Sequence, residues 1–229
     1  MDNDKITKSY TDGYAIKISP DSSSRCSICF DEAQPELCKS LEKLNVLCNL
    51  IISPSYDKIS FLINSIKSLL HVTDPKHDNY QKFTYSNGIS MAKCIGFQIF
   101  HLEQAERTLS WLTMKNIYVI DDTYYIYLGV KEIVEINQDQ HFTIFSPILK
   151  KNNIYLAPEL TSVSTIPASY HKNAVYYSLA QVIVVSLMPS QNKPKVTSAI
   201  LFPIVDTSLY WFLIRCFRSD PKSRICLLF

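Results

Sequence analysis

The sequence predicts an α+β protein of two lobes, a reduced β-rich lobe over residues 1–85 and a mainly helical lobe over residues 86–229. The first 85 residues alternate short apolar runs with polar breaks, which is typical of strands and turns. Apolar residues spaced by three and four without proline cover Ser90–Asn116, and a nearly unbroken apolar stretch covers Val175–Met188. Both patterns predict helices, the second one buried on all sides.

The β-rich lobe is expected to contain strands and one helix. Tyr14–Ile18 reads as a strand, and the residues after it form a polar loop. Apolar positions at helical spacing predict a helix within Glu36–Ile52, followed by strands at Ile59–Ile63 and Ser68–Val72. This part of the chain therefore resembles a small sheet with one helix packed on it.

The helical lobe is expected to open with one long helix over Ser90–Asn116 and to contain a few strands after it. Ile117–Ile120 reads as a strand, and Tyr124–Leu128 with Ile133–Ile136 reads as a hairpin around a glycine. Ser208–Phe217 has the spacing of a final amphipathic helix. A chain of 229 residues with 47% apolar side chains is long enough to bury one or two cores.

Composition argues against several classes of partner. The net charge is only +2 and no basic tract is present, so we expect neither nucleic-acid binding nor electrostatic docking to a membrane. The longest apolar run, Ala174–Met188, is shorter than the ~20 residues needed to span a bilayer. The N-terminal residues lack the apolar core of a secretory signal, and seven cysteines is an odd number. We therefore expect a cytoplasmic protein without a membrane span.

Three segments of the last third occur in the order found in eukaryotic protein kinases. They are Ala157–Glu159, which reads Ala-Pro-Glu, Tyr177–Ala180 within the apolar helix, and Asp220–Arg224, which reads Asp-Pro-Lys-Ser-Arg. These segments resemble the Ala-Pro-Glu motif, the central helix and the Asp-Pro-x-x-Arg turn of that family. The resemblance implies a two-lobed kinase-like fold, and it also implies a buried ion pair between Glu159 and Arg224.

The groups that move a phosphoryl group in this family are incomplete here. Tyr14-Ala15-Ile16-Lys17 resembles the Val-Ala-Ile-Lys strand, which makes Lys17 the candidate phosphate-binding lysine, but no glycine-rich loop precedes it. Asp121 is the candidate catalytic base, although its neighbours are not His and Arg and no Asn follows, and a simple Asp-Asp turn explains it as well. Two registers are open for the Asp-Phe-Gly segment, Asn137–Asp139 and Phe145–Pro147, and neither reads Asp-Phe-Gly; the first makes Asp139 the candidate magnesium ligand.

We therefore expect a pseudokinase, not an enzyme, that acts as a protein–protein interaction module or scaffold within a larger assembly and uses no cofactor or metal. The alternative is a divergent ATP-dependent Ser/Thr kinase that uses Lys17, Asp121 and Asp139. Cys26 and Cys29, with Cys38 and Cys48 further along, leave a structural zinc site as a weaker alternative, since paired cysteines are common zinc ligands.

Overall fold

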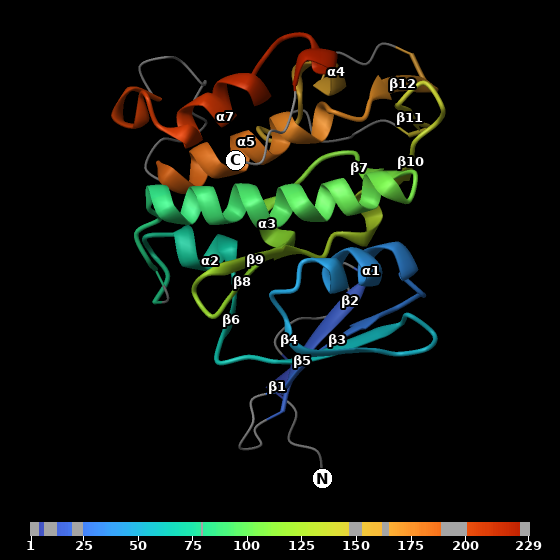
Figure 1. Ribbon diagram of the computed structural model, residues 1–229, viewed down its shortest axis with the longest axis vertical. Helices are drawn as coiled ribbons and strands as arrows, with labels where there is room; N and C mark the ends of the chain where they lie inside the picture. Colours follow the sequence, from blue (N-terminus) through green and yellow to red (C-terminus); the bar gives the residue numbers. More distant parts are fainter. Residues whose placement is uncertain are drawn as a thin grey trace.

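The protein has the mixed α+β fold that the sequence predicts. A computed structural model describes residues 5–6, 13–19, 25–78, 80–146, 153–161, 165–188 and 201–224. A sheet and one helix occupy the N-terminal end of the molecule, and a stack of helices lies beyond them toward the C-terminus (Figure 1).

An antiparallel sheet of five strands forms the N-terminal part. The strands are β1 (Lys5–Ile6), β2 (Tyr14–Ile18), β3 (Arg25–Phe30), β4 (Cys48–Ile52) and β5 (Lys58–Leu62). Their spatial order is β1-β2-β3-β5-β4. Side chains of β3 alternate between buried and half-buried positions, because successive residues of a strand point to opposite faces.

Helix α1 (Pro35–Lys43) connects β3 to β4 and packs on this sheet. Proline at its first turn and Glu36 beside it suit the start of a helix, and Lys43 suits the negative end of its dipole. Leu37 and Leu41 are fully buried against the sheet. One apolar core therefore lies between α1 and the five-stranded sheet.

A hairpin separates this core from a second one. Strands β8 (Ile117–Ile120) and β9 (Tyr124–Tyr127) pair with each other, and β6 (Ile66–Ser68) pairs with the outer edge of β8. The alternate side chains of the hairpin divide between the two cores. Those that join the sheet core are Tyr118, Ile120, Ile126 and Leu128. Those that join the helical core are Ile117, Val119, Tyr125 and Tyr127.

The second core is built from helices. These are α2 (Leu69–Thr73), α3 (Tyr85–Gln104), α5 (Ala174–Leu187) and α7 (Ser208–Cys216). A capping box between Thr84 and Asn87 starts α3. A Cβ on Gly88 would lie 2.8 Å from Leu209 Cδ2, so glycine at this position lets α7 approach α3 closely.

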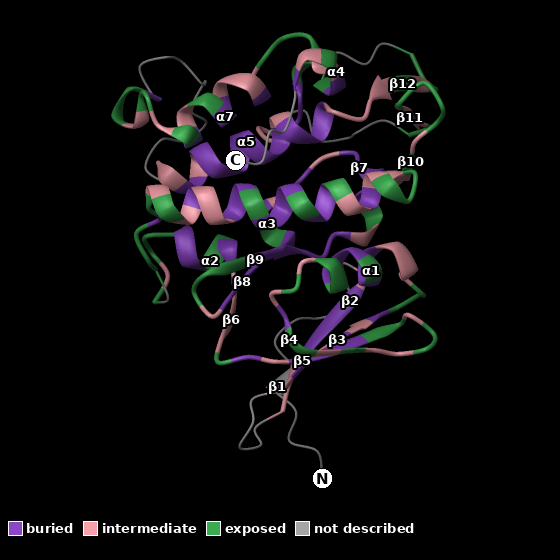
Figure 2. Ribbon diagram, in the orientation of Figure 1, coloured by how far each residue is buried: buried purple, intermediate pink, exposed green. Residues whose placement is uncertain are grey.

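Helix α5 is buried along most of its length, as its apolar sequence predicts (Figure 2). Two of its serines bind backbone carbonyls, since Ser186 Oγ donates to the Val182 carbonyl one turn earlier and Ser178 Oγ donates to the Tyr155 carbonyl outside the helix. It therefore forms the centre of the helical part.

Two short ribbons flank the helices. β7 (Arg107–Leu109) pairs with β10 (Ile133–Glu135), and β11 (His141–Ile144) pairs with β12 (Ala168–His171). A small third core with Phe142 and Leu160 at its centre joins β11 to the short helix α4 (Pro158–Thr161). Single turns of 3-10 helix occur at Met114–Asn116, Val130–Glu132, Phe202–Ile204 and Pro221–Ser223.

The expected helix over Ser90–Asn116 differs from the structure. The helix begins earlier, at Tyr85, and ends at Gln104, because Glu106 takes a left-handed conformation with φ 55° and breaks the helical path. Leu109 and Leu112 continue the apolar spacing and are fully buried, but they belong to β7 and to the loop after it. Apolar spacing alone does not distinguish these two arrangements.

The expected hairpin between Tyr124–Leu128 and Ile133–Ile136 is also wrong. β9 pairs with β8 across a turn in which Asp121 and Asp122 have φ of 50° and 56°, and β10 pairs with β7. Aspartate tolerates this left-handed conformation better than most residues, so the Asp-Asp pair closes the hairpin.

Two other expected elements differ in the N-terminal part. The helix expected within Glu36–Ile52 ends at Lys43, and Asn45 with φ 52° leads the chain into β4. The strand expected at Ser68–Val72 is helix α2 instead. Among the helices that the structure describes, none combines the length and the apolar character needed to cross a membrane.

Candidate functional site

The two residues that the kinase resemblance pairs are joined in the structure. Both terminal nitrogens of the Arg224 guanidinium donate to the Glu159 carboxylate, with Nη2 3.0 Å from Oε2. Arg224 is fully buried, and its Nε also donates to the carbonyl of Arg218 at 2.8 Å. A planar guanidinium matches a carboxylate in this two-bond geometry.

An aromatic ring and a turn complete the surroundings of Arg224. The guanidinium carbon lies 5.3 Å from the ring centre of Tyr177, close enough for a cation–π interaction. Burial raises the pKa of Tyr177, while the nearby Arg224 lowers it. The carboxylate of Asp220 accepts from the backbone N–H of Lys222 and from the hydroxyl of Ser223, so it holds the Asp-Pro turn that places Arg224.

The three candidate catalytic residues lie on three separate elements. Lys17 is half-buried on β2, opposite Ser27 of β3. Asp121 sits in the β8–β9 turn and Asp139 in the turn between β10 and β11, and Figure 1 shows these two turns at different ends of the molecule. Within the described ranges no hydrogen bond or ion pair joins any two of the three side chains.

The Asp121 side chain has a local structural role, and Asp139 takes part in its own turn through its backbone. Oδ1 of Asp121 accepts from the backbone N–H groups of Asn64 and Ser65, at 2.7 and 2.8 Å, and so ties the hairpin to the loop before β6. The backbone carbonyl of Asp139 contacts Nδ1 of His141 at 2.6 Å within its own turn. Neither arrangement collects carboxylates around a common point.

The space between the sheet and the start of the hairpin is filled by a tyrosine. Tyr14 is fully buried on β2, and its hydroxyl oxygen lies 3.3 Å from both Asn116 Oδ1 and Tyr118 Oη. Gly13, just before it, has φ +87°, and a Cβ there would lie 2.8 Å from Val130 Cγ2. The beginning of β2 therefore packs directly against the segment that follows β9.

A buried polar cluster joins α3, β9 and the 3-10 turn at Val130–Glu132. The side-chain amide of Gln98 binds the backbone of Tyr127 twice, donating to its carbonyl at 2.7 Å and accepting from its N–H at 3.0 Å. Asn116, Glu132 and Thr113 lie around the Tyr127 hydroxyl. Burial, followed by the charge of Glu132, raises the pKa of Tyr127 well above its ordinary value, so the phenol stays neutral.

The cysteines do not form the zinc site that their spacing allows. Cys26 and Cys38 are buried, Cys29 is half-buried and Cys48 is exposed. Burial raises the pKa of Cys26 and of Cys38 to about 12, so both thiols are protonated at neutral pH. In the part of the chain that the structure describes, no three His, Cys, Asp or Glu side chains gather in a metal-binding arrangement.

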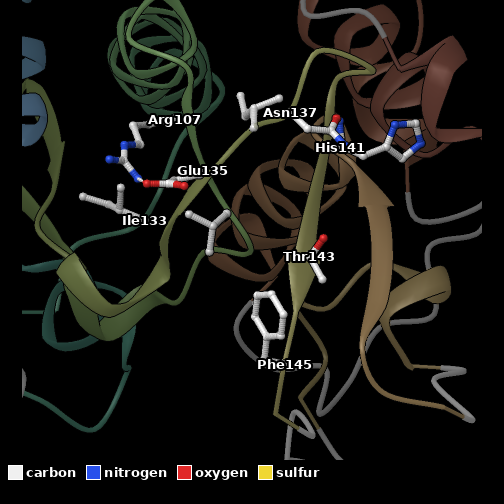
Figure 3. A pocket seen from close by; sticks show the side chains of 9 residues that line it. Arg107, Ile133, Glu135, Asn137, His141, Thr143 and Phe145 are labelled. Carbon is white, nitrogen blue, oxygen red and sulfur yellow. Dashed lines mark hydrogen bonds and ion pairs between the residues drawn. The ribbon is translucent and has the colours of Figure 1, made fainter.

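A surface pocket of about 470 Å³ opens between β10 and β11 (Figure 3). Side chains from both strands point into it, and the ion pair between Arg107 and Glu135, 2.7 Å long, lies at one side. Phe145 stands at the other end with 76% of its surface exposed. Sequence reasoning missed this pocket, because it depends on two strands that pair with other partners instead of with each other.

No protein-family model matches this chain, and no curated protein matches it.

Proposed function

We propose that this protein is a non-catalytic, protein-kinase-like module that acts through contacts with other proteins. The observation that carries the proposal is the contrast between an intact structural ion pair and a dispersed set of candidate catalytic groups. Arg224 and Glu159 are bound to each other, whereas Lys17, Asp121 and Asp139 lie on separate elements. Phosphoryl transfer in kinases depends on bringing such groups together around the nucleotide and its metal.

The N-terminal sheet supports this proposal. In protein kinases the phosphate-binding lysine lies on the third strand and pairs with a glutamate of the helix that follows. The third strand here is β3, it leads into α1, and it contains no lysine. Lys17 lies on β2 instead, one strand further from α1. The resemblance of Tyr14-Ala15-Ile16-Lys17 to the kinase strand motif therefore does not supply the ion pair between that lysine and a glutamate of the following helix.

The loops around the hairpin support it as well. Kinase catalytic loops have an aspartate five positions before an asparagine, and that asparagine and the aspartate of Asp-Phe-Gly bind magnesium. Asn116 immediately precedes β8, and the residue five positions before it is Trp111. The residues after β9 are Leu128, Gly129 and Val130, none of which carries a carboxylate. On this alignment both acidic groups are replaced by other residues.

The packing of Tyr14 is consistent with the same conclusion. Its ring lies edge-on to the ring of Tyr118, with 6.2 Å between their centres, and both side chains are buried. A nucleotide between the sheet and the hairpin would have to displace this contact and the hydrogen bond to Asn116.

Thermal unfolding with and without millimolar Mg·ATP tests the proposal. A ligand at ~100 times its dissociation constant adds ~2.7 kcal/mol to stability, which raises the melting temperature by several degrees. We expect no such rise. A rise that Lys17→Ala abolishes would instead favour an active nucleotide-binding kinase.

A second measurement addresses the interaction role. Crosslinking in native extracts should recover a protein partner, and substitutions at Lys17, Asp121 and Asp139 should leave its recovery unchanged. Alanine at an exposed aromatic residue such as Trp211, 49% exposed, is the type of change that should reduce it. Loss of partner recovery on changing only the three dispersed residues would contradict the proposal.

A further inference from the structure

Two consecutive strands of this protein leave facing edges without a partner. β10 pairs only with β7, and β11 pairs only with β12, among the strands that the structure describes. The turn between β10 and β11 is closed by two hydrogen bonds, from Asn137 N–H to the His141 carbonyl and from His141 N–H to Asn137 Oδ1. Beyond this turn the strands diverge and enclose the pocket of about 470 Å³ seen in Figure 3.

The free edge of β10 presents backbone groups to this pocket. Ser110 N–H donates to the Glu132 carbonyl, and Ile136 N–H donates to the Glu106 carbonyl. In an antiparallel ladder the bonded pairs alternate, so the even-numbered residues here bond to the β7 side. The N–H and C=O of Glu135 therefore point away from β7, and no hydrogen bond within the described residues reaches them.

The free edge of β11 does the same from the opposite side. Lys172 N–H donates to the Gln140 carbonyl, which sets the bonded pairs of this ladder at even-numbered residues of β11. Thr143 lies opposite Ser169 in a non-bonded pair. Its N–H and C=O therefore point toward β10, and within the described chain they have no hydrogen-bond partner.

Side chains on the two strands follow one alternating pattern. One face, which includes Ile133 and Glu135 of β10 with His141 and Thr143 of β11, lines the pocket, and Val134 of the opposite face borders it as well. The opposite face carries Val134, Phe142 and Ile144, which pack in or against the small third core. A strand placed between β10 and β11 would therefore meet an apolar surface on one side and, on the other, a mixed one that combines Ile133 with the Arg107–Glu135 ion pair.

We propose that an extended peptide segment of a partner protein, with alternating apolar and polar residues, binds as an added β-strand between β10 and β11. This proposal rests on the interaction role proposed above and names the surface that would serve it. The added strand joins the two ribbons into one sheet in the order β7-β10-peptide-β11-β12. Because β10 and β11 run in opposite directions, the peptide lies parallel to one strand and antiparallel to the other.

Backbone chemistry identifies a peptide as the occupant. Unpaired strand edges are templates for another chain, and strand addition derives its affinity from main-chain hydrogen bonds. Here each strand edge offers both N–H donors and C=O acceptors. The ligand must therefore carry acceptors and donors along both of its sides, spaced as they are along a β-strand. A polypeptide in extended conformation has this property. Its side chains also alternate between two faces, as the slot, which is the gap between the facing edges of β10 and β11, requires.

Panning a displayed library of random dodecapeptides against the full chain tests this proposal. A recovered peptide is labelled, and its binding is measured by fluorescence anisotropy. We expect Thr143→Pro to weaken binding at least tenfold, because proline removes the N–H that faces the slot. That N–H makes no bond to β12, so the ladder itself should survive.

Ser169→Pro is the matched control. It introduces the same residue directly opposite Thr143, but its missing N–H faces the outer edge of β12. We expect this variant to bind the peptide as the unmodified protein does. Circular dichroism of both variants establishes that they are folded.

Methylation of the peptide's own backbone provides a test that needs no variant. An inserted strand bonds to both neighbours, so an N-methyl group at either of two adjacent central residues should weaken binding to the unmodified protein. Weakening at only one of them would indicate pairing with a single edge and would overturn the insertion between β10 and β11.

Three further results would also overturn the slot proposal. The first is that panning recovers no binding peptide. The second is that the recovered peptides bind Thr143→Pro as tightly as the unmodified chain. The third is a concentration-dependent dimer that Thr143→Pro abolishes, because a second copy of the chain would then be the occupant. None of these bears on nucleotide binding. The Mg·ATP measurement therefore tests the non-catalytic role separately from this site.

Discussion

Arg224 and Glu159 lie 65 positions apart in the sequence and are joined by two hydrogen bonds between their side chains. Arg224 is fully buried, and Glu159 keeps 21% of its side-chain surface exposed. Removal of either partner leaves a charge without its counterion, and the cost is larger when the remaining charge is the buried one.

Arg224→Ala should lower the free energy of unfolding by about 3 kcal/mol, because it removes a buried pair and the contact with Tyr177. Glu159→Ala should cost at least as much, since it leaves the fully buried guanidinium without its counterion. The double variant should be little worse than either single one. Urea denaturation of the three variants measures this coupling, and Arg218→Ala, an exposed arginine in the same turn, is the control. Additive effects would show that the two residues do not stabilise each other.

The ion pair between Arg107 and Glu135 should contribute much less, although its 2.7 Å distance is short. Its side chains are 32% and 78% exposed, and water and salt screen a pair of this kind. Arg107→Ala should therefore change stability by only about 0–1 kcal/mol. The same urea titrations measure it. A loss as large as that of Arg224→Ala would contradict the view that burial, not distance, decides the strength of these two pairs.

Gln98→Ala should be strongly destabilising without any change of charge. Gln98 is fully buried and satisfies both backbone groups of Tyr127, and an unsatisfied buried group costs about 1–3 kcal/mol. Gln104→Ala, an exposed glutamine on the same helix, should change stability by less than about 0.5 kcal/mol. Thermal unfolding of both variants measures the difference. Equal melting temperatures would show that the Gln98 clamp is unimportant.

Stability should fall at alkaline pH because of buried thiols. Burial raises the pKa of Cys26 from 9.0 to about 12, so the folded protein keeps a proton that the unfolded chain releases above pH 9. The unfolded state is therefore stabilised relative to the folded one, and the contribution of Cys26 is intact below pH 9 and lost as the pH rises toward 12.

One such thiol gives a slope of at most about 1.4 kcal/mol per pH unit. Urea unfolding at pH 8, 9 and 10.5 measures it. Cys26→Ala should be less stable at pH 8 but should lose less stability as the pH rises. Cys48→Ala removes an exposed cysteine and should leave the slope unchanged. Identical slopes for all three proteins would show that Cys26 does not carry this dependence.

Local sequence predicted the elements whose pattern is unambiguous. The apolar run of α5 and the Asp-Pro turn before Arg224 needed no information from distant parts of the chain. The end of α3 was missed, since the left-handed conformation of Glu106 has no signal in the apolar spacing, which continues through Leu109. The pairing of β10 with β7 joins Glu135 to Arg107, and opposite charges at those two positions were its only hint.

The candidate site was harder to predict, because the position of each candidate residue depends on the number and order of the strands. Lys17 matches a four-residue motif, but only the order of strands shows that it lies on β2 and not on the strand before α1. The slot between β10 and β11 consists largely of backbone groups, such as those of Glu135 and Thr143, which any residue type can supply.

The β8–β9 hairpin has a consequence for how the molecule unfolds. Its alternate side chains belong to different cores, so Tyr118 cannot leave the sheet core while its neighbour Val119 stays packed on the helices. A chain cut after residue 85 would retain the sheet but would lack this layer. Unfolding of either core should therefore expose the apolar side chains of the other core to water. The slowest amide protons of β3 and of α5 should then exchange with solvent through the same global unfolding.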